Sequence, residues 1–122
     1  MYKFVLTFLM VCVLTSVQAE VVTETVNYNH GEVELEGYLA YDDSNDAKRP
    51  GVLVIHEWTG INDYTKMRCR KLAEMGYVAF AVDMYGKGIR PQNSQEASMQ
   101  AGIYRGDREL MRERVIAGLN EL

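Results

Sequence analysis

The chain has 122 residues, with 17 acidic side chains against 13 lysines and arginines, and its formal net charge is −4 at neutral pH. An acidic chain without a basic run is a poor ligand for nucleic acids or anionic membranes. Two cysteines and two histidines exclude a disulfide framework and argue against a structural zinc site, and 25% charged residues with 2 prolines are typical of a folded domain.

The first residues have the pattern of a secretory signal peptide. Lys3 precedes an apolar run over residues 4–17, and the small residue Ala19 ends the segment. The run is shorter than the roughly 20 apolar residues that span a bilayer. We therefore expect residues 1–19 to be removed on export, which leaves residues 20–122 as a periplasmic or secreted domain without membrane attachment.

Two alternating segments come next. Residues 22–28 alternate apolar and polar side chains, and residues 33–41 place valine, leucine and tyrosine on one side and glutamates on the other. A period of two predicts strands, the second with one buried face. Asn29–Gly31 between them suits a tight reversal. The two segments therefore predict an antiparallel hairpin, followed by a polar loop up to Pro50.

The pattern then changes to continuous apolar runs. Residues 51–56 and 77–82 are rich in β-branched side chains, which favours strands covered on both faces in a parallel sheet. The segment between them predicts a helix that Asn62 or Asp63 caps and that Gly76 ends. Strand, helix and strand form a βαβ unit, whose crossover should be right-handed.

Two further helices complete the pattern. Ser94 is the expected cap of the first, and Asp107 caps the second, which places Met111 and Val115 on one apolar face. A hairpin, a parallel pair and covering helices define an α/β fold class. A third buried strand is expected after the last helix, because the sheet otherwise keeps an open edge. We interpret the chain as the front part of a larger α/β domain, with a small complete domain as the alternative.

Candidate functional residues follow the first parallel strand. Active sites of open α/β sheets lie beyond the carboxyl ends of such strands. His56, Glu57 and the sole tryptophan, Trp58, occupy this position, and Gly60 permits a sharp turn in which backbone N–H groups can stabilise an oxyanion. The alternative is structural: Glu57 is solvated, Trp58 packs over the core and His56 hydrogen-bonds a neighbouring strand.

The second parallel strand is followed by four further candidates. Tyr85 can donate a hydrogen bond in the same cleft, and Lys87 and Arg90 can bind a substrate carboxylate or phosphate. Here too a structural alternative exists, in which Asp83 is a hydrogen-bond acceptor at the strand end, Tyr85 packs, and the two cations are ordinary surface charges.

Sharper catalytic motifs are incomplete. His56–Glu57 is not followed by the second histidine of a zinc protease, and Gly86–Gly88 lacks the third glycine of a dinucleotide fingerprint. Gly102–Gly106 has the length of a nucleophile elbow but holds a tyrosine at its centre. Cys69 lies inside a predicted helix, which favours a structural thiol. The residues alone therefore predict no complete catalytic constellation, and no cofactor or metal.

Two segments carry a resemblance to a known family. Residues 49–62, RPGVLVIHEWTGIN, and residues 72–88, LAEMGYVAFAVDMYGKG, closely resemble the dienelactone hydrolases, or carboxymethylenebutenolidases, most specifically around Glu57 and Asp83. The resemblance extends over essentially all of residues 20–122. It implies the front half of an α/β-hydrolase fold, with an N-terminal hairpin, a parallel βαβ unit and flanking helices.

The resemblance also implies roles for four residues. Glu57 corresponds to the family glutamate that interacts with the resting nucleophile, and Trp58 supplies a backbone N–H to the oxyanion hole. Lys87 stands where the family has an arginine that holds the substrate carboxylate, and Tyr85 lies beside it as a second substrate-binding residue. Lysine keeps the charge of that arginine but not its bidentate geometry.

The family's catalytic triad has no counterpart in this chain. Its nucleophile, usually the cysteine of a Gly-x-Cys-x-Gly turn, follows the strand after the last predicted helix, and the acid and the histidine come later. Since such domains ordinarily need about 200 residues or more, we expect a truncated hydrolase that is inactive as it stands. Its complete form would act on small esters or lactones. The alternative is a non-catalytic remnant or binding domain that retains the cleft loops.

Overall fold

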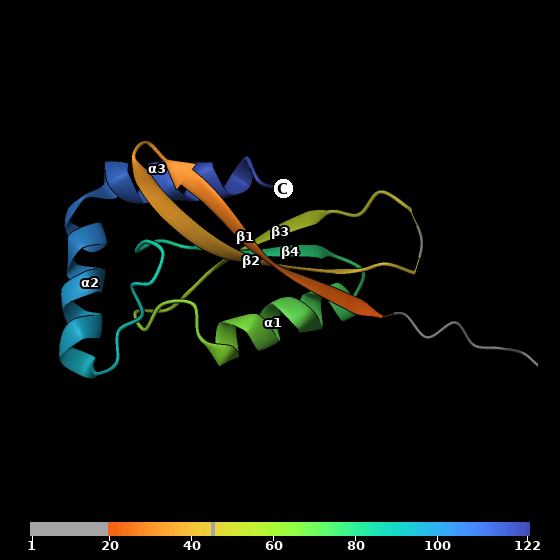
Figure 1. The fold of residues 1–122 in the computed structure, drawn as a ribbon, viewed down its shortest axis with the longest axis horizontal. Coiled ribbons are helices and arrows are strands. Elements are labelled where there is room, and N and C mark those ends of the chain that lie inside the picture. The colour runs from red at the N-terminus through yellow and green to blue at the C-terminus, as the bar shows by residue number, and fades with distance from the viewer. Residues whose placement is uncertain (1–19, 45) are drawn as a thin grey trace, which may run out of the picture.

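The computed structural model describes residues 20–44 and 46–122, and the predicted signal peptide lies outside these ranges. Every strand and helix predicted within them is confirmed. The elements, in chain order, are β1 (Val21–His30), β2 (Val33–Asp42), β3 (Gly51–Ile55), α1 (Asp63–Glu74), β4 (Val78–Val82), α2 (Ser94–Gly106) and α3 (Arg108–Leu119) (Figure 1).

The four strands of the described ranges form one mixed sheet in the order β1-β2-β4-β3. β1 and β2 pair antiparallel over their whole length, and Gly31 makes the reversal between them with a φ of 59°. β2 also pairs antiparallel with β4, and β4 pairs parallel with β3, with Val78 opposite Gly51. The predicted hairpin and βαβ unit therefore share a single sheet, in which β4 is an inner strand.

Helices cover both faces of this sheet (Figure 1). α1 packs over β2 and β4 on one face, whereas α3 packs over β1, β4 and β3 on the other. β4 alternates between the two cores: Phe80 and Val82 face α3, and Ala79 and Ala81 face α1. Gly118 allows α3 to approach closely, because a Cβ at this position would lie 2.6 Å from a methyl group of Val82.

Side-chain caps fix where the helices begin. Asn62, one of the two predicted candidates, caps α1, and Asp107 caps α3 as the sequence predicts. At α2 the cap is Asn93, whose side chain accepts a hydrogen bond from the Glu96 N–H, and Ser94 is the first helical residue. The predicted cap is therefore wrong by one residue, because the extended backbone that a cap requires lies at the asparagine.

Two predicted faces also differ from the structure. The alternation in β2 predicts one buried face, but Tyr38 and Ala40 are buried opposite Leu35 because α1 covers their side. The spacing in α3 predicts that Met111 is buried, whereas it is 40% exposed and Arg114 is buried instead. The helix is rotated relative to the predicted apolar face.

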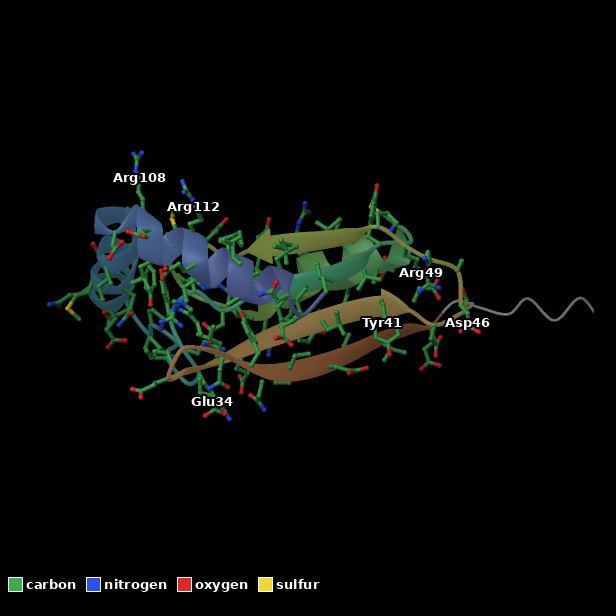
Figure 2. The ribbon with its side chains drawn as sticks, turned by 90° about the horizontal axis from the view of Figure 1, so that it is seen from above. Glu34, Tyr41, Asp46, Arg49, Arg108 and Arg112 are labelled. Atoms are coloured by element: carbon green, nitrogen blue, oxygen red, sulfur yellow. The ribbon has the colours of Figure 1, made fainter. Side chains whose placement is uncertain are left out.

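Among the described residues, β3 lies at the edge of the sheet and pairs with β4 alone. Its continuous apolar sequence predicts burial on both faces, but Val52–Val54 are only half-buried and Ile55 is 47% exposed. On the side of the molecule where β3 lies, opposite the hairpin that carries Glu34, Arg108 and Arg112 project from α3 (Figure 2). The open edge that the sequence predicts, beside which a further parallel strand fits, is therefore present at β3.

Candidate functional site

The carboxyl ends of β3 and β4 open into one cavity. Because the two strands are parallel neighbours, the residues that follow β3 lie beside those that follow β4. Side chains of α2 and of the start of α3 close the remaining wall. The cavity has a volume of about 240 Å³ and is lined by Ile55, His56, Glu57, Trp58, Met84, Tyr85, Ala101, Tyr104, Arg105 and Met111.

His56 links the two strand ends. Its Nε2 accepts a hydrogen bond from the Met84 N–H over 3.2 Å, and its Nδ1 lies 2.7 Å from the Glu57 carbonyl oxygen. This pairing assigns the proton to Nδ1, because a carbonyl can only accept. Burial lowers the pKa of His56, although the hydrogen bond to Glu57 opposes the shift. His56 is therefore a neutral crosslink, which matches its structural alternative.

Glu57 and Trp58 form the rim of the cavity, and both side chains are exposed. Gly60 closes the turn with a φ of 80°, and its N–H donates to the Glu57 carbonyl over 3.1 Å. Within the described ranges, neither the Trp58 backbone N–H nor the Glu57 carboxylate has a hydrogen-bond partner. A free backbone donor beside a cavity is the group that stabilises an oxyanion.

Tyr85 lies in the cavity wall with its polar groups engaged. Its hydroxyl donates to the Trp58 carbonyl over 2.9 Å, and its own carbonyl accepts from the Tyr104 hydroxyl over 3.2 Å. The ring packs edge-on against His56, with centroids 4.7 Å apart. Burial raises the pKa of Tyr85, so the hydroxyl keeps its proton. The structure thus brings Tyr85 to the predicted site as a bridge between its two loops.

Asp83 is fully buried and accepts three backbone hydrogen bonds. One oxygen binds the Glu36 N–H on β2 over 3.0 Å, and the other binds the N–H groups of Tyr85 and Gly86, each over 3.1 Å. The Asp83 N–H in turn donates to the Tyr28 hydroxyl. Asp83 therefore anchors the loop after β4 to the hairpin, which is its structural alternative.

The structure does not bring Lys87 to the cavity. Its Nζ lies 2.6 Å from the Glu34 carboxylate on β2, and this hydrogen bond raises the pKa of Lys87. Arg90 donates to the Gly86 carbonyl over 3.3 Å and pairs with the Glu36 carboxylate over 3.4 Å. Both cations hold the loop after β4 against the hairpin, so neither contributes to the cavity lining.

Residues of the last two helices complete the site without any sequence signal. Tyr104 and Arg105, in the last turns of α2, line the cavity, and Arg105 has no ion pair with any described residue. Burial raises the pKa of Tyr104, and the neighbouring Arg114 opposes the shift. Arg114 itself is buried, with Nε and Nη1 unpartnered among the described residues. These side chains are recognised as neighbours of the site only from the way α2 and α3 pack beside the ends of β3 and β4.

The described part of the chain offers no evident metal centre. Within residues 20–44 and 46–122, no three histidine, cysteine, aspartate or glutamate side chains gather as a metal-binding group. Cys69 is buried against the sheet, and burial raises its pKa to about 11, so it is a protonated structural thiol. None of the helices in these ranges is long and apolar enough to cross a bilayer.

Three kinds of comparison relate this chain to known proteins. The family model described as "Dienelactone hydrolase family" matches residues 35–120. The "Putative hydrolase fragment YghX" of Escherichia coli is 40% identical over 68 residues, which are 52% of this chain and 56% of that protein. The "Putative carboxymethylenebutenolidase" of Aquifex aeolicus is 38% identical over 77 residues, which are 61% of this chain and 32% of that protein.

A solved structure extends the comparison to the fold. The dienelactone hydrolase-like promiscuous phosphotriesterase P91 from metagenomic libraries matches with a TM-score of 0.77 and 34% identity, over 84% of this chain and 42% of that one. This likeness confirms the predicted α/β-hydrolase fold class and its N-terminal part. The chain thus spans about half or less of the length of the proteins that it matches.

Proposed function

Because the chain belongs to the dienelactone hydrolase family, we propose that it forms the N-terminal part of a hydrolase acting on small ester or lactone bonds. The observation that carries this proposal is the cavity at the ends of β3 and β4. Glu57 and Trp58 share its rim, and Tyr85 forms its wall. A cavity of about 240 Å³ suits a small substrate.

In the proposed reaction a nucleophile attacks the carbonyl carbon, and the carbonyl electron pair moves onto oxygen. The Trp58 N–H donates to this oxyanion, and its lack of a partner among the described residues supports the assignment. Collapse of the intermediate expels the alkoxide leaving group, which takes up a proton, and water then hydrolyses the acyl-enzyme. Tyr85 shapes the wall, and Lys87 contacts a substrate carboxylate only when its ion pair with Glu34 opens.

We place the nucleophile, the acid and the histidine of the triad outside these 122 residues. Two candidates within the chain are already engaged: Cys69 is buried, and the Nε2 of His56 accepts the Met84 N–H. The matched structure is more than twice as long as the part that aligns with this chain. The unpaired edge of β3 adjoins Glu57, so a nucleophile on a further parallel strand would reach the carboxylate that the family resemblance assigns to it.

The coding sequence beyond Leu122 tests this proposal. We expect, in frame, a buried strand ending in Gly-x-Cys-x-Gly or Gly-x-Ser-x-Gly, with an aspartate and a histidine later. The product of that frame should hydrolyse p-nitrophenyl acetate, and Glu57→Ala should slow it, whereas Glu109→Ala on the exposed face of α3 should not. A stop codon after Leu122, or ester hydrolysis by the 122-residue chain that Glu57→Ala abolishes, contradicts the proposal.

We further propose that the protein is exported to the periplasm or secreted. The apolar run behind Lys3 supports export. β1 begins at Val21, directly after the predicted cleavage site between Ala19 and Glu20, so cleavage leaves every described element intact. Mass spectrometry of the protein recovered from the envelope or the medium should give Glu20 as the first residue. A cytosolic protein that retains residues 1–19 contradicts export.

A non-catalytic binding domain is the second candidate function. It is favoured by two hydrogen bonds at the cavity whose partners all come from this chain, from the Met84 N–H to His56 Nε2 and from the Tyr85 hydroxyl to the Trp58 carbonyl. Because Trp58 is the sole tryptophan and lies on the rim, its fluorescence reports occupancy of the cavity. Saturable binding of a small ester without turnover supports this candidate, and unchanged fluorescence at millimolar ester contradicts it.

A further inference from the structure

The two peptide groups that flank the Trp58 α-carbon are both held by hydrogen bonds. The Glu57 carbonyl accepts from the Gly60 N–H over 3.1 Å and from His56 Nδ1 over 2.7 Å. The Trp58 carbonyl accepts from the Tyr85 hydroxyl over 2.9 Å. Because a trans peptide group is planar, a carbonyl held in one direction points the next N–H in the opposite direction. The bonds to the Glu57 carbonyl therefore aim the Trp58 N–H.

The two side chains that hold these carbonyls are fixed in turn. The Met84 N–H donates to His56 Nε2 over 3.2 Å, which keeps the imidazole proton on Nδ1 and directs it at Glu57. Tyr85 is 5% exposed, and its ring lies 4.7 Å from the His56 ring and 5.3 Å from the Tyr104 ring, measured between centroids. Neither side chain can turn without breaking a hydrogen bond and an aromatic contact.

We propose that His56 and Tyr85 are positioning residues that together aim the Trp58 N–H at the oxyanion. This inference rests on the proposed function, in which Trp58 supplies an oxyanion donor. His56 acts through the Glu57 carbonyl, and Tyr85 acts through the Trp58 carbonyl, so that both peptide planes at Trp58 are fixed. A donor held in place before the reaction needs no reorganisation during it. Loosening either link should therefore lower kcat rather than raise KM.

Backbone dynamics of the 122-residue chain test the Tyr85 link without reference to activity. Tyr85→Phe keeps the ring and deletes the hydroxyl that binds Trp58. We expect the ¹⁵N order parameter of the Trp58 amide to fall from about 0.85, typical of rigid backbone, to below about 0.6. The matched control is Tyr64→Phe in α1, because this tyrosine is 54% exposed and its hydroxyl has no hydrogen-bond partner among the described residues. The control should leave the order parameter of Trp58 unchanged.

A pair of substitutions at His56 separates its hydrogen bonds from its bulk. An asparagine amide can present an N–H donor near the position of Nδ1, whereas leucine presents none. We therefore expect His56→Leu to mobilise the Trp58 amide as Tyr85→Phe does, and His56→Asn to keep it largely rigid. Equal mobility in both variants would mean that packing, not the bond to Glu57, matters at this position, and would overturn the role of His56.

Steady-state kinetics of the hydrolase separate this inference from the function on which it rests. In the product of the reading frame that continues beyond Leu122, we expect Tyr85→Phe to lower kcat by about tenfold or more, with little change in KM. The loss should not exceed the roughly 10²–10³-fold loss that follows removal of a whole oxyanion donor. An immobile Trp58 amide in Tyr85→Phe overturns the inference, whatever the activity. A mobile amide with unchanged kcat supports the mechanical link and overturns the oxyanion role of Trp58.

Discussion

Asp83→Asn should destabilise the protein, because Asp83 is fully buried and uses both carboxylate oxygens as acceptors. One oxygen accepts from the Tyr85 and Gly86 N–H groups and the other from the Glu36 N–H, and the residue is 0% exposed. An asparagine keeps one acceptor oxygen and replaces the other with an NH2 donor. Whichever way the amide turns, at least one backbone N–H loses its acceptor and faces another donor.

The asparagine amide orientation that costs less free energy keeps an oxygen at the position that accepts two N–H groups and loses the hydrogen bond from the Glu36 N–H. A hydrogen bond to a charged acceptor contributes about 1.5–3 kcal/mol, and the two bonds that remain become weaker because the amide is neutral. Loss of the buried charge offsets part of this cost. It also leaves Arg90, whose guanidinium lies 3.7 Å from Asp83, without that counter-charge. We expect the free energy of unfolding to fall by about 2–3 kcal/mol.

Urea unfolding followed by circular dichroism measures this loss as a lower midpoint at constant slope. The matched control is Asp107→Asn at the start of α3, where the side chain accepts a single hydrogen bond from the Leu110 N–H. Asparagine caps helices about as well as aspartate, so this change should stay within about 0.5 kcal/mol. A loss for Asp83→Asn no larger than that for Asp107→Asn refutes the reasoning.

Three further expectations concern packing and titration. Gly118→Ala should lower the free energy of unfolding by about 1–2 kcal/mol, because the new Cβ lies 2.6 Å from Val82, whereas Gly102→Ala, with nothing within 4 Å, should raise it by about 0.5–1 kcal/mol; unfolding curves that shift in the same direction contradict this pair. Since burial lowers the pKa of His56, this imidazole binds a proton below about pH 6.5 in the unfolded chain but stays neutral in the folded chain until the pH is lower. This contribution to stability is complete above that pH and is lost as the pH falls toward the lowered pKa. It is measured by comparing the unfolding midpoints of the native chain and of His56→Asn across this pH range. Parallel midpoint-against-pH profiles for the two proteins contradict the expectation. Burial also raises the pKa of Cys69 to about 11, so a thiol reagent at neutral pH should label Cys69 slowly in the folded chain and quickly in the urea-unfolded chain; equal labelling rates at this residue contradict it.

The elements of the fold were predictable because their signals are local. Period-two alternation, a glycine at φ 59° and the side-chain caps Asn62 and Asp107 each act within a few residues of chain. Faces were harder to predict, because burial depends on what packs above them. Tyr38 is buried by α1, which is remote in sequence, and Arg114 is buried by the rotation of α3 on the sheet.

The candidate site shows the same division. Glu57, Trp58 and Tyr85 meet because parallel neighbours bring their carboxyl ends to one edge, a rule that sequence can apply. Lys87 follows the same strand, but the pairing of β2 with β4 places Glu34 within reach of its ammonium group and removes it from the cavity. Arg105 reaches the cavity only through the docking of α2, for which no motif exists.

Hydrogen-bond saturation separates the residues that build the site from those that can react in it. The carboxylate of Asp83, the imidazole of His56 and the hydroxyl of Tyr85 each form hydrogen bonds with backbone groups. A substrate can bind them only if these structural hydrogen bonds break. The Glu57 carboxylate and the Trp58 N–H have no such partners within the described ranges. Residues that hold the site together must keep their hydrogen bonds throughout a reaction, whereas a reacting group needs an unused donor or acceptor. The family resemblance assigns reacting roles to Glu57 and Trp58 on other grounds, and both groups are among those at the cavity without a hydrogen-bond partner in the described part of the chain.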